Sequence, residues 1–232
     1  MLNLKKNTLK RELISTNDGS KTLLINGLEE TYHSKHGALQ EANHVFIKNG
    51  LDLINSYEIN ILELGFGTGL NVLVTFDAYL RNDKNHKINY YGVEKYPIFF
   101  HEASELSYSE LFPNPIVKDL SLKIHETEWE KLVELDSNFN LKKIKDDFFN
   151  IKNMDLPPID LVYFDCFGAR VQPDLWEKEI FEIVASKMKT GGLLTTYSSK
   201  GTMRRALIEL GFEVEKRQGP PGKREMLIAW KK

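Results

Sequence analysis

Cysteine is almost absent from this chain, and its scarcity limits the chemistry that the sequence can support. Cys166 is the only cysteine among 232 residues, so neither an internal disulfide nor a cysteine-based metal cluster can form. The six histidines show no His-Glu-x-x-His or similar spacing, and we expect no metal site. So little cysteine is typical of a reducing compartment, and we expect the protein to be cytoplasmic.

Long apolar runs are also missing. No stretch approaches the roughly 18–20 consecutive apolar residues that cross a bilayer, so we expect no membrane association. Residues 1–11 are polar and basic without an apolar centre, and we expect no secretory signal. Hydrophobic residues still make up 41% and charged residues 28% of the chain, a composition that supports the core of a soluble domain.

An excess of charge of one sign occurs only near the end of the sequence. The formal net charge is −2, but residues 200–232 carry nine Lys or Arg against four Glu, a local net charge of +5. A basic segment on an acidic body can bind a polyanion, although charge alone favours a solvated surface. The candidate polyanion-binding residues are Lys200, Arg204, Arg205, Lys216, Arg217, Lys223 and Arg224.

Strand and helix patterns alternate through residues 59–232. Strands are expected at 59–65, 88–94, 141–145, 159–165, 193–197, 212–217 and 225–230, and helices at 70–80, 98–106, 175–188 and 202–210. This alternation predicts an α/β fold, a Rossmann-like doubly wound sheet with helices on both faces. Because residues 218–224 are too few for a parallel crossover, the last two strands should form an antiparallel hairpin. We expect this connecting loop to lie at the sheet edge, away from the central strands.

Residues 1–58 precede the alternating pattern. Segments 9–16 and 21–25 flank an Asn-Asp-Gly-Ser turn, which predicts a β-hairpin, and residues 37–49 have the spacing of a helix. The segment is short for an independent domain. We therefore expect a small β-hairpin/helix extension, residues 1–58, that caps the active site of a catalytic domain formed by residues 59–232.

A glycine-rich loop follows the first strand of the alternating pattern. Residues 63–71 read Glu-Leu-Gly-Phe-Gly-Thr-Gly-Leu-Asn, and glycine at alternate positions lets the backbone turn tightly and approach a ligand. The dinucleotide fingerprint requires glycine where Leu70 stands. The G-x-G-x-G pattern instead resembles the loop that binds S-adenosylmethionine in class I methyltransferases, although a plain strand-to-helix turn would also fit.

Acidic residues end the next two strands. Glu94 can accept hydrogen bonds from both hydroxyls of a ribose. Asp147 could accept from an adenine amino group with Phe148 packed on the ring, and chemistry alone does not separate it from Asp146. The candidate cofactor-binding residues are Glu63, Gly65, Phe66, Gly67, Thr68, Gly69, Asn71, Glu94, Lys95, Asp147 and Phe148.

Asp165, at the end of the strand expected at 159–165, is the candidate catalytic residue. Ligands of open α/β sheets bind at the carboxyl ends of the strands, near the switch in strand order. A carboxylate at that position can orient an amine nucleophile and accept its proton during methyl transfer. A turn or helix-capping role would also fit. The neighbouring Cys166 has no histidine partner nearby in sequence and is interpreted as a packing residue.

Two further blocks, Pro-Asp-Leu-Trp at 173–176 and Gly-Lys-Arg-Glu-Met-Leu at 222–227, make the chain similar to a known family. It resembles the methyltransferase domain of the bifunctional tRNA 5-methylaminomethyl-2-thiouridine biosynthesis proteins and its stand-alone relatives, over nearly the whole chain. The resemblance implies S-adenosylmethionine as cofactor, tRNA as partner and the 5-aminomethyl group of wobble 5-aminomethyl-2-thiouridine as methyl acceptor. It also implies that Asp165 lies near the reacting amine.

The chain departs from the family pattern in two respects. Cys166-Phe167-Gly168-Ala169 stands where the family usually has Gly or Ala followed by Phe-Ala-Pro, and Gly168 loosens a turn that proline would stiffen. The sequence contains no flavin-binding oxidase half, so we expect a stand-alone form.

Two other functions stay open. The chain could methylate another amine, on a small molecule or a protein, or it could be a catalytically silent tRNA-binding protein on the same fold. The intact glycine loop, Glu94 and Asp165 argue against a silent protein, and the basic C-terminal segment favours tRNA over a small amine.

Overall fold

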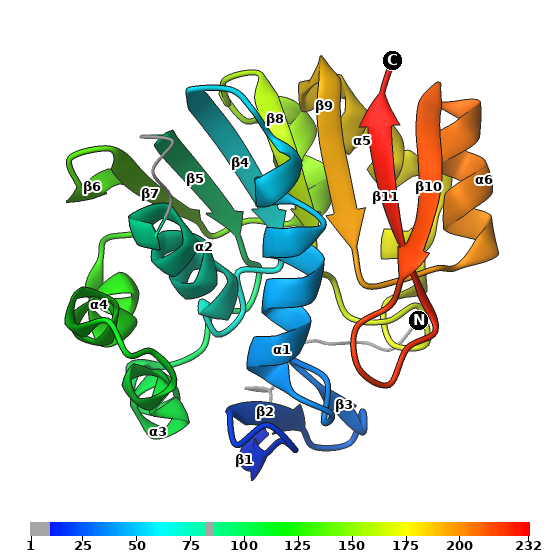
Figure 1. The fold of residues 1–232 in the computed structure, drawn as a ribbon. Helices are drawn as coiled ribbons and strands as arrows, with labels where there is room; N and C mark the ends of the chain where they lie inside the picture. Colours follow the sequence, from blue (N-terminus) through cyan, green and yellow to red (C-terminus); the bar gives the residue numbers. More distant parts are fainter. Residues whose placement is uncertain (1–9, 82–85) are drawn as a thin grey trace.

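A mostly parallel eight-stranded sheet forms the centre of the computed structural model, which describes residues 10–81 and 86–232 (Figure 1). The strand order is β10-β11-β9-β8-β4-β5-β7-β6. The strands are β4 (Glu58–Leu64), β5 (Lys87–Val93), β6 (Leu132–Asp136), β7 (Phe139–Ile144), β8 (Ile159–Phe164), β9 (Met188–Thr196), β10 (Phe212–Gln218) and β11 (Glu225–Lys231). The predicted antiparallel hairpin of the last two strands is confirmed, and so is the doubly wound α/β fold.

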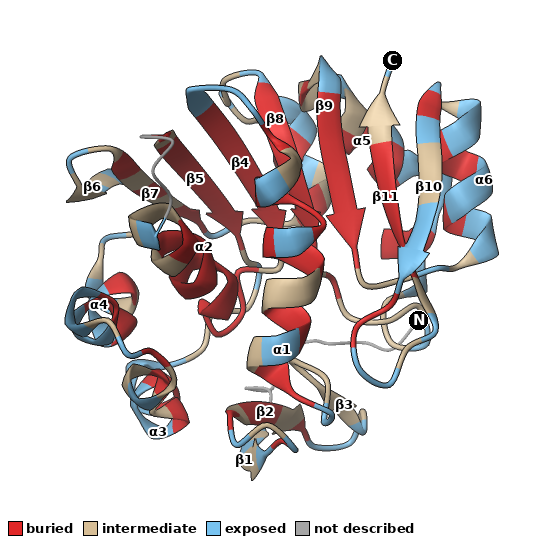
Figure 2. Cartoon of the chain, viewed as in Figure 1, coloured by how far each residue is buried: buried red, intermediate tan, exposed pale blue. Residues whose placement is uncertain are grey.

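Helices cover both faces of the sheet, as the sequence predicted. Figure 1 shows α1 (Ala38–Ala42) and α2 (Leu70–Arg81) on one face and α5 (Lys178–Lys187) on the other, with α6 (Gly201–Glu209) beside β10. Successive residues of a strand point to opposite faces, so Ile61 joins the core under α2 while Leu62 joins the core under α5. β8 is buried along its whole length and β4 from Ile59 onward (Figure 2), which explains their continuous apolar runs.

The N-terminal segment forms a second, three-stranded antiparallel sheet of β1 (Arg11–Ser15), β2 (Lys21–Ile25) and β3 (Glu30–Thr31). The predicted hairpin strand begins at Leu9, which lies outside the described residues. After β3 the chain enters α1, which continues as a π-helical segment, η1 (Asn43–Lys48). Leu23, Ala42 and Phe46 belong to the same hydrophobic core as the large sheet. The segment therefore packs as part of one body, at the edge where the parallel strands end (Figure 1).

A long helix and an edge strand between β5 and β7 were not predicted. The helix α4 (Pro115–Glu126) begins with proline in its first turn, and the Asn114 side chain accepts a hydrogen bond from Ile116 N, a common helix start. The edge strand β6 pairs antiparallel with β7. Because β6 is short and half exposed, it lacks the apolar run that marks a buried strand. The sheet therefore ends in antiparallel pairs on both sides.

The predicted helix at 175–188 is confirmed as α5 except at its start. Residues Pro173–Trp176 form a separate 3-10 turn, η5, and α5 ends at Lys187. The glycines at 191 and 192, taken as the helix stop, lie inside β9. There the register against β8 shifts and Gly191 has a φ of 79°, as expected for an irregularity within a strand. In the described ranges no helix is long and apolar enough to cross a membrane.

Candidate active site

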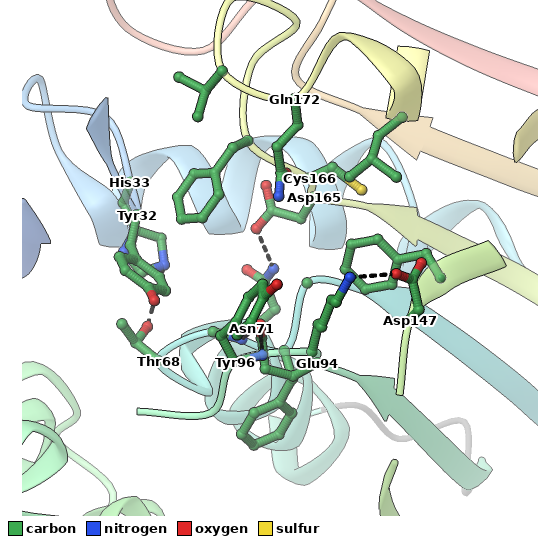
Figure 3. Close-up of a pocket in the computed structure, with 18 of the residues that line it drawn as sticks. Tyr32, His33, Thr68, Asn71, Glu94, Tyr96, Asp147, Asp165, Cys166 and Gln172 are labelled. Atoms are coloured by element: carbon green, nitrogen blue, oxygen red, sulfur yellow. Dashed lines mark hydrogen bonds and ion pairs between the residues drawn. The ribbon is translucent and has the colours of Figure 1, made fainter. Parts of the chain in front are cut away.

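A pocket of about 480 Å³ opens at the carboxyl ends of β4, β5 and β8 (Figure 3). It lies where the strand order reverses, between β4 and β8, the usual ligand position in such sheets. Its volume falls within the roughly 300–1,000 Å³ of small-molecule sites. The lining includes Gly65–Thr68 of the glycine loop, Glu94, Asp147 and Asp165, so the structure brings together most of the predicted site residues.

Two positions of the glycine loop, Gly65 and Gly67, favour a residue without a side chain. Gly65 has a φ of 101° and Gly67 a φ of 49°, in the region that favours glycine. A Cβ on Gly65 would lie 2.5 Å from the carbonyl oxygen of Asp165, and one on Gly67 would lie 3.1 Å from Cδ1 of Tyr32. The loop is therefore packed between the tip of β8 and the N-terminal segment, with its backbone exposed to the pocket.

Glu94 lies at the tip of β5 with its carboxylate held beside the glycine loop. It accepts hydrogen bonds from Gly67 N at 3.1 Å and from Tyr96 N at 2.7 Å. Burial raises the pKa of Glu94, and these backbone donors oppose that shift. The carboxylate is thus fixed on the pocket wall as an acceptor (Figure 3).

The structure separates the two aspartates that the sequence left equivalent. Asp147 lines the pocket, ion-pairs with Lys95 at 2.6 Å and accepts a hydrogen bond from Phe149 N. Asp146 instead accepts from the Asn150 side chain at 2.6 Å and is not part of the pocket wall. Phe148 lines the pocket beside Asp147.

Two members of the candidate cofactor set, Glu63 and Gly69, lie outside the pocket wall. Glu63 is fully buried because its strand position directs the side chain beneath the loop, towards α2. Gly69 packs against α4, where an added Cβ would lie 2.7 Å from Cδ1 of Ile124. Their sequence positions within the motif did not reveal this difference.

Asn71 links Glu63 to Asp165. Its Nδ2 donates to Oε1 of Glu63 and to Oδ2 of Asp165, each at 2.8 Å (Figure 3). Burial raises the pKa of Glu63 to about 8. Burial, with the nearby charge of Glu41, raises the pKa of Asp165 to about 7, while the Asn71 hydrogen bond and Lys223 act in the opposite direction. Glu63 therefore keeps its proton at neutral pH, and Asp165, which faces the pocket, carries the ionisable charge.

The loop after β8 is held by contacts that the sequence did not reveal. Trp176, from the Pro-Asp-Leu-Trp block, is 1% exposed and donates its indole N–H to the carbonyl of Phe167 at 2.8 Å. Val171 N donates to the carbonyl of Gly168 at 2.9 Å. Cys166 is buried and burial raises the pKa of its thiol, in keeping with a packing residue. The loop thus forms an ordered turn without the proline.

Tyr32 and His33, from the N-terminal segment, form one side of the pocket. Tyr32 packs edge-on against Phe167, with ring centroids 5.0 Å apart, and its hydroxyl accepts from Arg11 Nε. Burial lowers the pKa of His33 to about 4, and its Nε2 lies 3.3 Å from Oγ1 of Thr68 in the glycine loop. The periodic pattern of the sequence gave no signal for either residue.

Arg170 ties the N-terminal segment to the loop after β8. Its guanidinium ion-pairs with Glu30 at 2.7 Å and donates to the carbonyl of Leu28 at 3.0 Å. With Tyr32 and Phe167, this contact encloses the pocket between two segments far apart in sequence.

The expectation that the loop at 218–224 stays away from the central strands is wrong. Because β11 runs antiparallel to its neighbours, the hairpin loop lies at the edge where β8 and β9 end. Lys223 ion-pairs with Glu41 of α1 at 2.6 Å and places its Nζ 3.8 Å from the ring centroid of Tyr197. The Tyr197 hydroxyl donates to the carbonyl of Cys166 at 2.8 Å. Lys223 is therefore part of the active-site surroundings.

The remaining candidate polyanion-binding residues fall into two groups. On β10, Lys216 ion-pairs with Glu225 at 2.9 Å and Arg217 with Glu215 at 2.6 Å. The others form no ion pair with any carboxylate in residues 10–81 and 86–232. These unpaired residues are Lys200, Arg204, Arg205 and Arg224. The described ranges contain no cluster of three or more His, Cys, Asp or Glu that could hold a metal ion.

Comparisons with known proteins identify the family of the chain. Residues 114–232 match a family model described as S-adenosyl-L-methionine-dependent methyltransferase. A Burkholderia mallei protein named tRNA 5-methylaminomethyl-2-thiouridine biosynthesis bifunctional protein MnmC is 32% identical over 93% of this chain and 34% of its own length. A Leptospira interrogans protein of the same name is 31% identical over 86% of this chain and 32% of its own length. The chain thus spans about a third of the curated relatives it matches.

A solved structure is similar over almost the whole chain. The crystal structure of MNMC2 from Aquifex aeolicus superposes with a TM-score of 0.79 at 25% sequence identity, covering 98% of this chain and 72% of that one. The similarity includes the N-terminal segment as well as the large sheet.

Proposed function

Because this chain belongs to the S-adenosyl-L-methionine-dependent methyltransferase family, we propose that it methylates the 5-aminomethyl group of wobble 5-aminomethyl-2-thiouridine in tRNA, giving 5-methylaminomethyl-2-thiouridine. One observation carries the proposal. Asp165, a carboxylate with a pKa of about 7, faces the pocket beside the glycine loop and is held there by Asn71. The names of the relatives supply the candidate acceptor.

The pocket suits the chemistry of the methyl donor. Glu94 offers a fixed acceptor for ribose hydroxyls, and Asp147 with Phe148 offers an acceptor and an aromatic ring for adenine. The backbone at Gly65 and Gly67 is free of side chains that would block an amino-acid tail. When bound, S-adenosylmethionine supplies an electrophilic methyl carbon on its sulfonium sulfur.

Asp165 would prepare the amine for attack. An aliphatic amine is largely protonated at neutral pH and must lose a proton before its lone pair can react. Asn71 occupies Oδ2 of Asp165, and the other carboxylate oxygen is available to accept that proton. The protonated Glu63 adds no second negative charge beside it. After transfer, Asp165 releases the proton to solvent through the open side of the pocket.

The assay for this function uses defined RNA. An anticodon stem-loop carrying 5-aminomethyl-2-thiouridine is incubated with the protein and methyl-labelled S-adenosylmethionine, and the nucleosides are identified by mass spectrometry. The expected product is 5-methylaminomethyl-2-thiouridine, with no label on a stem-loop that has unmodified uridine. Transfer to free amines but not to this RNA would overturn the proposed substrate.

Cofactor binding is tested separately by calorimetry. Glu94→Ala should weaken S-adenosylmethionine binding by about 1.5–3 kcal/mol, the scale for hydrogen bonds to a charged acceptor. Asp147→Ala should also weaken it, and Asp146→Ala is the matched control that should not. Equal affinity of wild type and Glu94→Ala would remove Glu94 from the cofactor site.

A further inference from the structure

A second, smaller pocket of about 380 Å³ lies next to the active site. Its lining consists of Tyr197, Ser198, Ser199, Lys223, Arg224 and Glu225. Tyr197 joins the two sites, because its hydroxyl donates to the carbonyl of Cys166, the residue after Asp165. A molecule with its reactive end near Asp165 would therefore have its neighbouring part close to this pocket.

Positive charge dominates the second pocket once ion pairs are considered. Glu225, its only carboxylate, is neutralised by Lys216 at 2.9 Å, and this hydrogen bond lowers the pKa of Glu225. Lys223 is in turn matched by Glu41. Arg224 is exposed and has no carboxylate partner in the described ranges. Its charge is uncompensated and faces solvent at the pocket.

The segment that follows the pocket serines carries two more cations that have no carboxylate partner in the described ranges. Lys200 directly follows the pocket serines, and its backbone N donates to Oγ of Ser198 at 3.3 Å. Arg205 folds back over the start of α6, since its Nη1 would lie 3.4 Å from a Cβ on Gly201. Hydroxyls beside ammonium and guanidinium groups are the donors that bind phosphate oxygens.

The two pockets differ in charge in a way that matches the two parts of a nucleotide. With the Lys95–Asp147 and Arg170–Glu30 ion pairs discounted, the active-site pocket keeps the carboxyl groups of Glu94, Asp165 and Asp174, which would repel a phosphate. An uncharged base with a cationic amine can enter there, whereas its phosphodiester must stay outside. The adjoining second pocket offers Arg224, which has no carboxylate partner among the described residues.

We infer that the pocket at Ser198, Ser199 and Arg224 binds a backbone phosphate of the substrate RNA, one that flanks the target nucleotide. Arg224 supplies the main charge, and the serine hydroxyls donate to the remaining phosphate oxygens. Lys216 and Arg217 are not phosphate ligands, because their charges are already paired, Lys216 with Glu225 of β11 and Arg217 with Glu215 of β10. This inference rests on the proposed function and assigns part of its RNA-binding surface.

The experiment combines a protein change with a matched change in the RNA. Wild type and Arg224→Ala are titrated by fluorescence anisotropy with the modified stem-loop and with copies in which one linkage beside the target is a neutral methylphosphonate. Arg217→Ala is the control, since it removes an arginine of the same hairpin whose charge is paired. S-adenosylmethionine affinity, measured on each protein, verifies that the fold is intact.

Arg224→Ala should bind the normal stem-loop roughly 10- to 100-fold more weakly, the equivalent of one charge-assisted hydrogen-bonding group. The slope of log affinity against log salt should fall by about 0.7–0.9, one phosphate contact. A neutral linkage on one side of the target should weaken RNA binding by the wild type by a similar factor. The same linkage should hardly change RNA binding by Arg224→Ala. Arg217→Ala should stay within about twofold of wild type.

Each contrary result has a separate meaning. If neutral linkages weaken wild type and Arg224→Ala equally, the pocket does not hold a phosphate. If Arg217→Ala loses as much affinity as Arg224→Ala, the effect is general surface charge and the inference is overturned. If wild type methylates the stem-loop and Arg224→Ala binds it unchanged, the inference fails and the proposed function stands. If wild type neither binds nor methylates it, the proposed function itself has failed.

Discussion

Replacing Glu63 with glutamine tests whether a buried carboxyl beneath the glycine loop carries a proton. Glu63 is fully buried, and its pKa is raised by burial from 4.5 to about 8. Between these values the folded protein keeps the proton that the unfolded chain releases. The stabilisation from this group is therefore complete below pH 4.5 and is lost as the pH rises towards 8.

The size of the effect follows from the pKa difference. Each pKa unit corresponds to at most about 1.4 kcal/mol. The contribution of Glu63 to the unfolding free energy should therefore be about 2–3 kcal/mol smaller at pH 7 than at pH 4.5. Glutamine has the shape of the protonated acid and does not titrate. It also keeps an oxygen that can accept from Asn71 Nδ2, so Glu63→Gln should methylate at close to the wild-type rate.

The assay is urea unfolding of both proteins from pH 5 to pH 8, followed by tryptophan fluorescence. The difference between the two unfolding free energies reports Glu63 together with its coupling to Asp165, because the remaining titrating groups are common to both. This difference should grow with pH in favour of Glu63→Gln. Glu58→Gln, on the exposed start of the same strand, is the control and should show no such growth, since its pKa is lowered by Lys87. A Glu63→Gln difference that is constant with pH would refute the protonated state.

Three further predictions concern the active site. Asp165→Asn should keep S-adenosylmethionine affinity but lower the single-turnover rate on the order of 10²-fold or more; full activity would exclude Asp165 from proton transfer. The wild-type rate should rise with pH, and the midpoint of this rise should lie near pH 7, because the Asp165 carboxyl group ionises there. In pH-rate profiles Lys223→Met should move this midpoint up and Glu41→Gln should move it down, and shifts in the same direction would contradict the electrostatic account. Gly67→Ala, at a φ of 49°, should lower the free energy of unfolding by about 1–2 kcal/mol. Because its Cβ would press on Tyr32 of the pocket wall, it should also weaken S-adenosylmethionine binding in calorimetry. Gly19→Ala, at a φ of 83° in open space, should strain the backbone without changing that affinity.

The positions of the strand-end residues were predictable from sequence. Parallel strands in one sheet end at the same edge, so Glu94 and Asp165, each at the end of an apolar run, had to lie near the glycine loop. The run itself arises because both faces of a central strand are buried. By the same reasoning β6 was missed, since a half-exposed edge strand has no such run.

Local pattern did not reveal which side chains enter the pocket. Glu63 and Gly69 belong to the same motif as Gly65, yet only Gly65 lines the wall. The direction of each side chain depends on how the loop packs against β8 and α4. Tyr32 and His33 reach the pocket only because the N-terminal sheet docks at the ends of the parallel strands.

Amino-acid sequence alone determined the fold class, the glycine loop and the order of acidic residues along the strands, because these depend on hydrogen-bonding periodicity and on the backbone freedom of glycine. Tertiary structure decided the charge states. The pKa of Asp165 depends on Asn71, 94 residues away, and on Glu41 and Lys223, which are 182 residues apart and form an ion pair. Lys223 and Arg224 are neighbours in sequence, and only the fold pairs Lys223 with a carboxylate and leaves Arg224 unpaired among the described residues. Electrostatic energy depends on distance and burial, which the chain acquires only when its distant segments pack together.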